Sequence, residues 1–243
     1  MSRSAPNSIN PAPPTLQECP IRKRQLKMEA LEMLIIHHLG LSQSDRIVWL
    51  CEELGIDYEL RRYERDPKTR LAPPDYRALT PFGTAPVISD GEVVLGESAA
   101  IVEYIAEMHG NGRFLVRRGS PNYPEFLFWF HFANGSFMPA AMVNSIASRV
   151  GNEDAVVAAL SARLDRAYDL IDERLGNTLF LAGDAFTVAD IMMLFPLTTM
   201  RAFSKRDIGP YVHIRAYLQR IAARPAFQRA MKKADPGFEL PLT

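Results

Sequence analysis

Two consecutive polar residues, Glu97 and Ser98, stand at the start of a predicted helix. A helix N-terminus together with a serine hydroxyl can bind a carboxylate, and a neighbouring glutamate can bind an ammonium group. Glu97 and Ser98 therefore predict a site for the head group of an α-amino acid. The structural alternative is that Ser98 is the N-cap of the helix and that Glu97 offsets the helix dipole.

A proline at the start of a predicted strand marks a second candidate contact with a ligand. Pro86 opens the run 85–89, where it cannot donate to a sheet ladder and must occupy the first position or a turn. A cis Ala85–Pro86 peptide would leave the backbone N–H and C=O of Ala85 free to pair with an extended, peptide-like ligand. An ordinary turn proline is the alternative.

A serine-containing loop precedes the first predicted helix. Ser44 is expected to be the N-cap of that helix, which leaves Ser42 free near the helix N-terminus. No G-x-S-x-G turn surrounds either serine. His37 and His38 are consecutive on a strand and point to opposite faces, so they cannot act as a pair, either as bases or as metal ligands. Ser42 is therefore expected to donate a hydrogen bond rather than to act as a nucleophile.

The elements that position these residues follow a β-α-β then β-β-α order. Apolar, partly β-branched runs predict strands, and the Asp90-Gly91 pair between two of them predicts a hairpin. This order is that of a thioredoxin-like domain with a mixed sheet of about four strands. The expected strands are 33–39, 58–63, 85–89 and 92–95, with helices from about 45 to 54 and from Ser98 to near Gly110.

The second half of the chain, residues 123–243, is predicted to be all-α and follows a Gly/Pro/Arg-rich linker at 111–122. Phe186 to Ile191 predicts a helix start with a capping box of Thr187 and Asp190 and a hydrophobic staple. The surplus of aromatic residues between Phe126 and Phe137 exceeds one helix face and is typical of a partner surface or a ligand cleft. The expected helices are 126–150, interrupted near Gly135 and Pro139, then 157–175 with Gly176 as its stop, one starting at Thr187, Val212–Ala222 and Pro225–Lys232.

The composition excludes several classes of protein. The 243 residues carry 28 Lys and Arg against 28 Asp and Glu, which argues against binding to nucleic acid. No apolar run reaches the ~18–20 residues that a membrane span requires. Cys19, Cys51 and five histidines without ligand spacing favour neither a disulfide scaffold nor a metal site. Residues 1–32 are proline-rich and lack a secretory apolar segment, so we expect a flexible extension on a cytoplasmic protein.

The β-α-β then β-β-α order, followed by an all-α half, resembles a cytosolic glutathione S-transferase. Three motifs support the resemblance: Gly-Thr-Ala-Pro-Val at 83–87, Glu-Ser-Ala-Ala-Ile at 97–101 and Phe-Thr-Val-Ala-Asp-Ile at 186–191. The resemblance covers residues 33 to about 233, and the segment 37–55 is most similar to serine-type bacterial and fungal members. It implies a thioredoxin-like glutathione-binding domain at 33–110 and an all-α domain that forms the electrophile site. It also implies a homodimer, and glutathione as co-substrate without a metal.

The resemblance assigns roles residue by residue. The catalytic hydroxyl of the family corresponds to Ser42, with Ser44 as the second choice. Glu97 and Ser98 correspond to the pair that holds the γ-glutamyl group. Ala85, before a cis Pro86, corresponds to the residue that pairs with the cysteinyl backbone, and Thr84 stands where the family often has a lysine.

Three functions remain open from the sequence. The first is conjugation of glutathione to a hydrophobic electrophile, with Ser42 stabilising the thiolate. The second is another glutathione-dependent reaction at the same site, namely peroxide reduction, dehalogenation or ether cleavage. The third is a non-enzymatic interaction protein of the same fold, against which the presence of Ser42, Glu97 and Ser98 argues.

Overall fold

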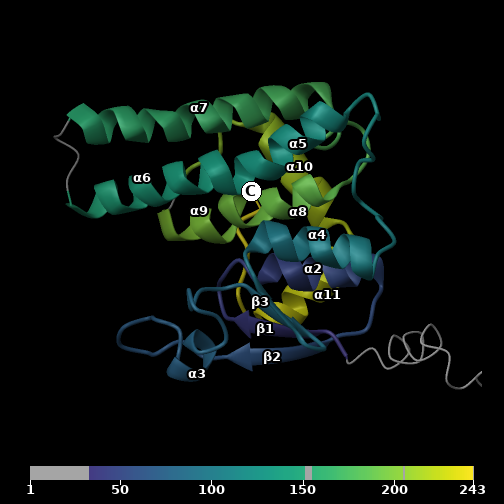
Figure 1. The fold of residues 1–243 in the computed structure, drawn as a ribbon. Coiled ribbons are helices and arrows are strands. Elements are labelled where there is room, and N and C mark those ends of the chain that lie inside the picture. Colours follow the sequence, from purple (N-terminus) through teal and green to yellow (C-terminus); the bar gives the residue numbers. More distant parts are fainter. Residues whose placement is uncertain (1–32, 151–154, 205, 243) are drawn as a thin grey trace, which may run out of the picture.

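The computed structural model describes residues 33–150, 155–204 and 206–242. The expectation for residues 1–32 and for Cys19 lies outside these described residues. A four-stranded sheet forms the base of the molecule, in the order β2-β1-β3-β4 (Figure 1). Strand β1 pairs parallel to β2 and antiparallel to β3, and β3 pairs antiparallel to β4. The strands are β1 (Ile35–Leu39), β2 (Glu59–Tyr63), β3 (Val87–Asp90) and β4 (Val93–Gly96).

Helices cover both faces of this sheet. Helices α2 (Asp45–Leu54) and α4 (Ser98–Met108) lie between the sheet and the helical half of the molecule (Figure 1). The short helix α3 (Pro74–Arg77) covers the other face through the buried Tyr76, which packs with Leu39 and Val87. The predicted thioredoxin-like order is confirmed, and α3 is an addition inside a segment that the sequence predicted only as a loop.

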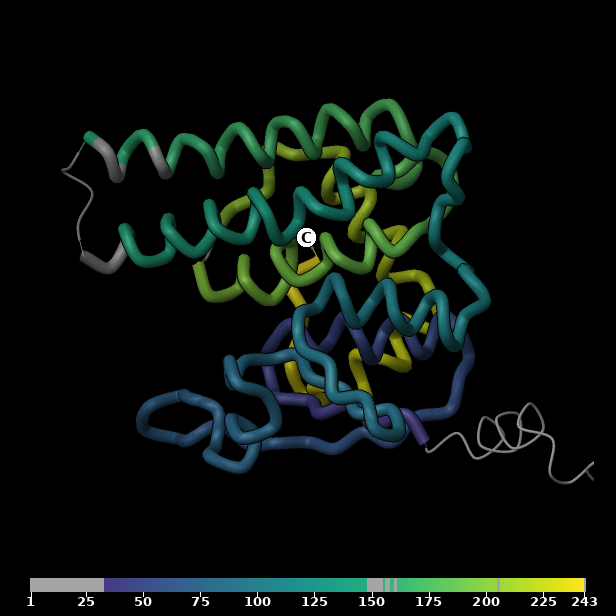
Figure 2. The backbone as a smooth tube through the Cα atoms, in the orientation of Figure 1, coloured from purple at the N-terminus to yellow at the C-terminus, as the bar shows by residue number. Residues whose placement is uncertain are grey.

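All the named elements in the described residues of the second half are helices, as predicted. Helices α6 and α7 run side by side and extend beyond the sheet (Figure 2). The predicted interruption near Gly135 is a π-helical turn, η1, that joins α5 to α6. The elements are α5 (Tyr123–Phe132), η1 (Ala133–Phe137), α6 (Met138–Val150), α7 (Ala155–Asn177), α8 (Val188–Leu197), α9 (Thr199–Ser204), α10 (Val212–Ala222) and α11 (Pro225–Ala234).

Helix α8 begins as the sequence predicts. The Thr187 hydroxyl accepts from the Ala189 N–H at 3.3 Å, and the Asp190 carboxylate accepts from the Thr187 N–H at 2.8 Å. The Asp190 carboxylate also accepts from the Leu181 N–H and the Tyr217 hydroxyl. Burial raises the pKa of Asp190 to about 6, against the opposing effect of these hydrogen bonds. The capping box therefore ties α8 to the preceding loop and to α10.

One continuous apolar core joins the two halves. In the sheet-containing half this core includes the buried Ile36 and Trp49. In the helical half it includes the buried Trp129, Ile191 and Leu194. Helix α11 returns from the helical half to pack on α2. There the Arg224 guanidinium donates twice to the Glu53 carboxylate, at 2.6 and 2.8 Å. Helix α2 also packs on α8, so the loop between β1 and α2 lies next to the helical half.

Candidate functional site

A cavity of about 480 Å³ lies between the two halves, and its two walls differ in chemistry. The wall formed by the sheet-containing half carries polar groups, those of Ser42, Gln43 and Thr84. The opposite wall is apolar and comes from α6, α8 and α9, through Met138, Met142, Phe195, Met200 and Phe203. Such a cavity suits a ligand with one polar and one apolar part.

Ser42 lies in the loop after β1 and lines the cavity while remaining only 5% exposed. Its Oγ lies 2.7 Å from Ser44 Oγ and accepts from the Ser44 N–H at 3.3 Å. The N-terminus of α2 begins three residues later, at Asp45. The dipole of α2 therefore acts on the part of the cavity that Ser42 lines, where it favours an anion.

Ser44 occupies the N-cap position of α2, but the prediction that its side chain caps the helix is wrong. The side chain makes no capping bond. The Ser44 hydroxyl is instead bonded to His38 Nδ1 at 2.8 Å and to Ser42 Oγ. The physical reason is that the end of β1 places the fully buried His38 beside the loop, and that buried imidazole needs a partner.

The N-cap of α4 is Glu97, one residue before the predicted Ser98. Glu97 adopts a left-handed backbone with φ of +69°, which is uncommon for a residue with a side chain, and it is exposed. Ser98 is the first helical residue and is 2% exposed. Its hydroxyl therefore does not cap α4, and it is free to join a network with other elements.

That network fixes the Ser98 hydroxyl from three sides. Ser98 Oγ accepts from Arg46 Nη1 at 3.0 Å and from Asn134 Nδ2 at 2.8 Å. It donates to Gln43 Oε1 at 3.2 Å. Arg46 Nη1 also donates to Gln43 and to Asn134. Since Gln43 lines the cavity, the network links Ser98 to the cavity through that side chain.

The Ala85–Pro86 peptide is cis, as predicted. Thr84 and Ala85 line the same cavity as Ser42, so the structure brings these three predicted residues together. Pro86, Glu97 and Ser98 are not among the residues that line it. Ser98 lies behind Gln43, and Glu97 lies on the surface next to it.

Several residues at or behind this cavity were missed by the sequence analysis. Arg65 and Arg77 line it as cations. Asn134, on the π-helical turn, completes the Ser98 network, and His38 with Asp235 lies behind Ser42. None of these residues carried a local motif, because each meets the site through contacts across the fold. Two of them, Asn134 and Asp235, come from the helical half of the chain.

Two buried charged residues of α2, Asp45 and Arg46, lie beneath the cavity. Burial raises the pKa of Asp45 to about 7, against the opposing effects of Arg46 and His38. Burial also lowers the pKa of Arg46 to about 10, so this guanidinium stays charged at neutral pH. Among the described residues Asp45 Oδ1 and Arg46 Nε and Nη2 have no hydrogen-bond partner.

The raised pKa of Asp45 should make the free energy of unfolding depend on pH. An Asp45→Asn variant should lack this contribution. The folded state holds the Asp45 proton more tightly than the unfolded state, so this group's stabilising contribution falls as the pH rises from about 4 to about 7. The full change is up to about 4 kcal/mol. We expect the free energy of unfolding in urea to fall less between pH 5 and pH 8 in Asp45→Asn than in the wild type.

The comparison must be made between the variant and the wild type, because other groups titrate in the same window. Asp190 adds a slope of the same sign, whereas burial and Arg61 lower the pKa of His37, which adds the opposite slope. Asp190 and His37 are present in both proteins, so their contributions cancel in the difference between the variant and the wild type. Equal pH dependence in the variant and the wild type would show that Asp45 is ionised in the folded state throughout.

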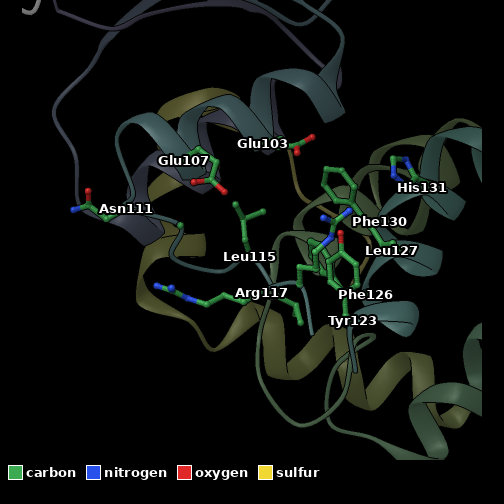
Figure 3. Close-up of a pocket in the computed structure, with 13 residues that line it drawn as sticks. Glu103, Glu107, Asn111, Leu115, Arg117, Tyr123, Phe126, Leu127, Phe130 and His131 are labelled. Atoms are coloured by element: carbon green, nitrogen blue, oxygen red, sulfur yellow. The ribbon is translucent and has the colours of Figure 1, made fainter. Parts of the chain in front are cut away.

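A larger cavity of about 560 Å³ lies elsewhere, between α4 and α5. Figure 3 shows Glu103 and Glu107 of α4 on one side and Tyr123, Phe126 and Phe130 of α5 on the other. None of the predicted site residues lines it. Size alone therefore does not select the candidate active site, and the smaller cavity with Ser42 is the one that collects the predicted groups.

Comparison with known proteins decides the family. A model of the glutathione S-transferase N-terminal domain matches residues 42–108, and a model of the C-terminal domain matches residues 132–225. The chain is 30% identical over 220 residues to glutathione S-transferase 3 of Schizosaccharomyces pombe, covering 84% of this chain and 88% of that relative. The chain belongs to the glutathione S-transferase family.

Other members of the glutathione S-transferase family support this membership over most of the chain. Glutathione S-transferase 1 of Saccharomyces cerevisiae is 25% identical over 229 residues, covering 84% of this chain and 97% of that protein. The solved structure of a glutathione S-transferase from Actinobacillus pleuropneumoniae is similar with a TM-score of 0.77 and 28% identity, covering 84% and 95% of the two chains. The resemblance inferred from the sequence motifs is therefore confirmed.

Among the residues that the structure describes, no group of three or more His, Cys, Asp or Glu side chains is arranged to hold a metal ion. Within the same residues, none of the helices combines the length and the apolar character needed to cross a membrane.

Proposed function

We infer that this protein is a glutathione transferase that binds glutathione, stabilises its thiolate with Ser42 and conjugates it to a hydrophobic electrophile. The observation that carries this function is that Ser42 lines one cavity together with Thr84 and Ala85 and with the apolar side chains of α6, α8 and α9. A nucleophile held there lies next to both the peptide-binding groups and the apolar side chains. Proximity of the two reactants then supplies much of the rate.

Ser42 acts on the ionisation of the bound thiol. A free cysteine-like thiol has a pKa of about 8.5 and is mostly protonated at neutral pH. A hydroxyl donor and the N-terminus of α2 both favour the thiolate over the thiol. Lowering the thiol pKa by roughly two units requires about 2.7 kcal/mol, which one charge-assisted hydrogen bond and the helix dipole together can supply.

The two ends of glutathione need opposite charges from the protein. Glu97 offers an exposed carboxylate for the ammonium of the γ-glutamyl group, and the buried Ser98 hydroxyl is assigned to the γ-glutamyl carboxylate, which requires the Gln43 side chain to move aside. At the other end Thr84 lacks the charge for the glycyl carboxylate. Arg77 lines the cavity and is exposed, so it can supply that charge.

Binding measurements with two ligands test these assignments together. Glu97→Gln should weaken glutathione and the truncated dipeptide γ-glutamylcysteine by a similar factor, about tenfold, because both ligands keep the ammonium group. Arg77→Ala should weaken glutathione but leave the dipeptide, which lacks the glycyl carboxylate, unchanged. The measurement is isothermal calorimetry of each protein with each ligand.

The crossed design contains its own controls. Glu97→Gln is the control for a general loss of the site, because its effect does not depend on the glycyl group. An Arg77→Ala variant that loses affinity equally for both ligands would contradict the glycyl assignment. Unchanged affinity for glutathione in both Glu97→Gln and Ser98→Ala would contradict the γ-glutamyl site.

The reaction class is tested with three electrophiles. The apolar wall of Met138, Phe195 and Phe203 suits an aromatic substrate. Conjugation of glutathione to chlorodinitrobenzene is expected. Activity with a hydroperoxide or an aryl ether but not with chlorodinitrobenzene would replace conjugation by one of the other glutathione-dependent reactions on the same site.

The enzyme is proposed to work as a cytoplasmic homodimer, with the thioredoxin-like half of one copy against the helices of the other. The cavity between α4 and α5 supports this, because carboxylates of Glu103 and Glu107 and guanidinium groups of Arg117 and Arg118 line it together. A two-fold axis can bring the acidic part of one copy onto the basic part of the other. The exposed Phe128 of α5, 49% accessible, would be covered by such an interface.

Light scattering checks the dimer. The wild type should give twice the chain mass of 27.3 kDa at micromolar concentration. Glu107→Arg should shift the mass towards 27.3 kDa because it places like charges together, whereas the same change at the exposed Glu92 of the β3–β4 turn should have no effect. A wild type of 27.3 kDa would contradict the dimer.

A further inference from the structure

Four side chains form a continuous hydrogen-bonded chain behind the cavity. Ser42 Oγ lies 2.7 Å from Ser44 Oγ, and Ser44 Oγ lies 2.8 Å from His38 Nδ1. His38 Nε2 lies 3.4 Å from Asp235 Oδ1. His38 and Ser44 are fully buried, and only Ser42 lines the cavity. The chain thus leads from the cavity to a buried imidazole and on to a carboxylate.

The carboxylate end fixes the direction of every bond in the free protein. An ionised Asp235 only accepts hydrogen bonds, and it accepts from the Leu41 N–H at 3.1 Å, so His38 Nε2 carries a proton towards it. In a neutral imidazole Nδ1 is then the acceptor for the Ser44 hydroxyl. Because a hydroxyl has a single proton, Ser42 must in turn donate to Ser44. The oxygen of Ser42 therefore faces the cavity as an acceptor.

This direction is the wrong one for stabilising a thiolate, which needs a donor. While both hydrogen bonds of Ser44 are kept, Ser42 can donate into the cavity only if Ser44 donates to Ser42, and Ser44 can do so only if His38 Nδ1 carries a proton. A protonated His38 is therefore the condition under which Ser42 serves the role proposed for it.

We propose that His38 accepts the proton of the glutathione thiol through Ser44 and Ser42. The S–H bond breaks as Ser42 Oγ takes the thiol proton. Ser42 passes its own proton to Ser44, and Ser44 passes its own to His38 Nδ1. The products are a thiolate that accepts from the Ser42 hydroxyl and an imidazolium paired with Asp235. No electrons are transferred, and the proton leaves by the reverse path once the product has gone.

Charged and titratable groups face His38 from β2, from α2 and from the segment after α11. Asp235 faces His38 Nε2, and the buried Asp45 of α2 also interacts with His38. Two cations oppose them from β2 and the loop that follows: Arg62, which is in register with His38, and Arg65, which interacts with Asp235. Arg62 is exposed, and Arg65, like Asp235, is partly buried. His37 lies on the opposite face, bonded to Tyr63 and Ser89.

The backbone holds Asp235 where the relay needs it. Leu41, which donates to Asp235, has a left-handed φ of +52°. A Cβ at Gly40 would lie 3.3 Å from Asp235 Oδ1, so a larger residue there would push the carboxylate away by a few tenths of an ångström. His38, Ser44 and Asp235 act through Ser42 and are therefore positioning residues. Ser44 and His38 also carry the proton, whereas Asp235 stays ionised and orients His38.

The test rests on the proposed function, because it requires bound glutathione, and it uses the full-length protein. The variants are Ser44→Ala, which interrupts the chain, and Ser44→Thr, which restores a hydroxyl. His38→Gln and the opposite-face control His37→Gln complete the set. Two readouts are needed: the pKa of the bound thiol from its thiolate ultraviolet absorbance, and the protons released on binding, from calorimetry in buffers of different ionisation enthalpy.

In the wild type we expect thiolate to form near neutral pH with little proton release, because His38 keeps the proton. Ser44→Ala and His38→Gln should raise the pKa of the bound thiol by about one unit and lower the conjugation rate at neutral pH about tenfold. Any thiolate that these variants form should release its proton to the buffer. Ser44→Thr and His37→Gln should behave as the wild type.

Two results would overturn the relay, and they differ from a failure of the proposed function. If Ser44→Ala and His38→Gln keep the wild-type thiol pKa, the hydrogen-bonded chain is only structural. If the wild type releases a full proton on binding, His38 is not the acceptor. If glutathione binds without forming thiolate in any of the proteins, the proposed role of Ser42 fails and the relay fails with it.

Discussion

Replacing Ser42 by alanine should lower the conjugation rate at neutral pH by ~10–100-fold, because one to two units of thiol pKa depression are lost. Glutathione affinity should stay nearly unchanged, since the groups proposed to hold its two ends, Glu97, Ser98 and Arg77, remain in place. Raising the pH should restore much of the rate, because base in solution then deprotonates the thiol. The measurement is the pH profile of kcat/KM for the wild type and the variant.

A matched control separates this effect from the loss of any hydroxyl. Ser89 is half-buried on β3 and bonded to His37, on the opposite side of β1 from His38. Ser89→Ala should leave the pH profile unchanged. A Ser42→Ala enzyme with the wild-type profile would mean that another group holds the thiolate.

Replacing Arg46 by methionine should destabilise the protein by about 3 kcal/mol. Arg46 Nη1 donates to the side chains of Gln43, Ser98 and Asn134. Methionine cannot donate, so each of these acceptors would lose a hydrogen bond in the protein interior. The Arg46 charge also lies beside the buried Asp45. The variant should bind glutathione more weakly as well, because Gln43 and Ser98 lose the group that orients them.

A double variant tests the electrostatic part of this effect. Adding Asp45→Asn to Arg46→Met should recover part of the lost stability, because no carboxyl group is then left to ionise without its neighbouring cation. The free energy of unfolding in urea measures both steps. Arg61→Met, at an exposed arginine paired with Glu59 on β2, is the control and should change stability by no more than about 0.5 kcal/mol. An Arg46→Met variant as stable as Arg61→Met would contradict the account.

The sequence predicted the sheet and the helix starts well, because local patterns determine them. Alternating and β-branched runs identify the strands within two residues, and Asp90-Gly91 marks the turn between β3 and β4. Pro225 and the Thr187–Asp190 box mark two helix starts correctly. The four-residue helix α3 and the six-residue α9 are too short for a periodic pattern to show.

The details of the site could not be predicted, because they depend on contacts between distant parts of the chain. Ser44 and Ser98 are residue types that favour N-caps, yet neither side chain caps a helix. One is drawn to His38 and the other to Arg46 and Asn134, which is 88 residues beyond Arg46. Asp235 reaches His38 from 197 residues away. Propensity predicts where a serine stands but not which tertiary partner claims its hydroxyl.

The most direct test of the account is the pKa of the glutathione thiol bound to the wild-type protein, followed by thiolate absorbance as the pH is raised. A thiol activated by Ser42 and the N-terminus of α2 should ionise with an apparent pKa of about 6.5, roughly two units below the free value. Bound glutathione whose thiol still titrates at about 8.5 would show that this cavity binds the peptide without activating it.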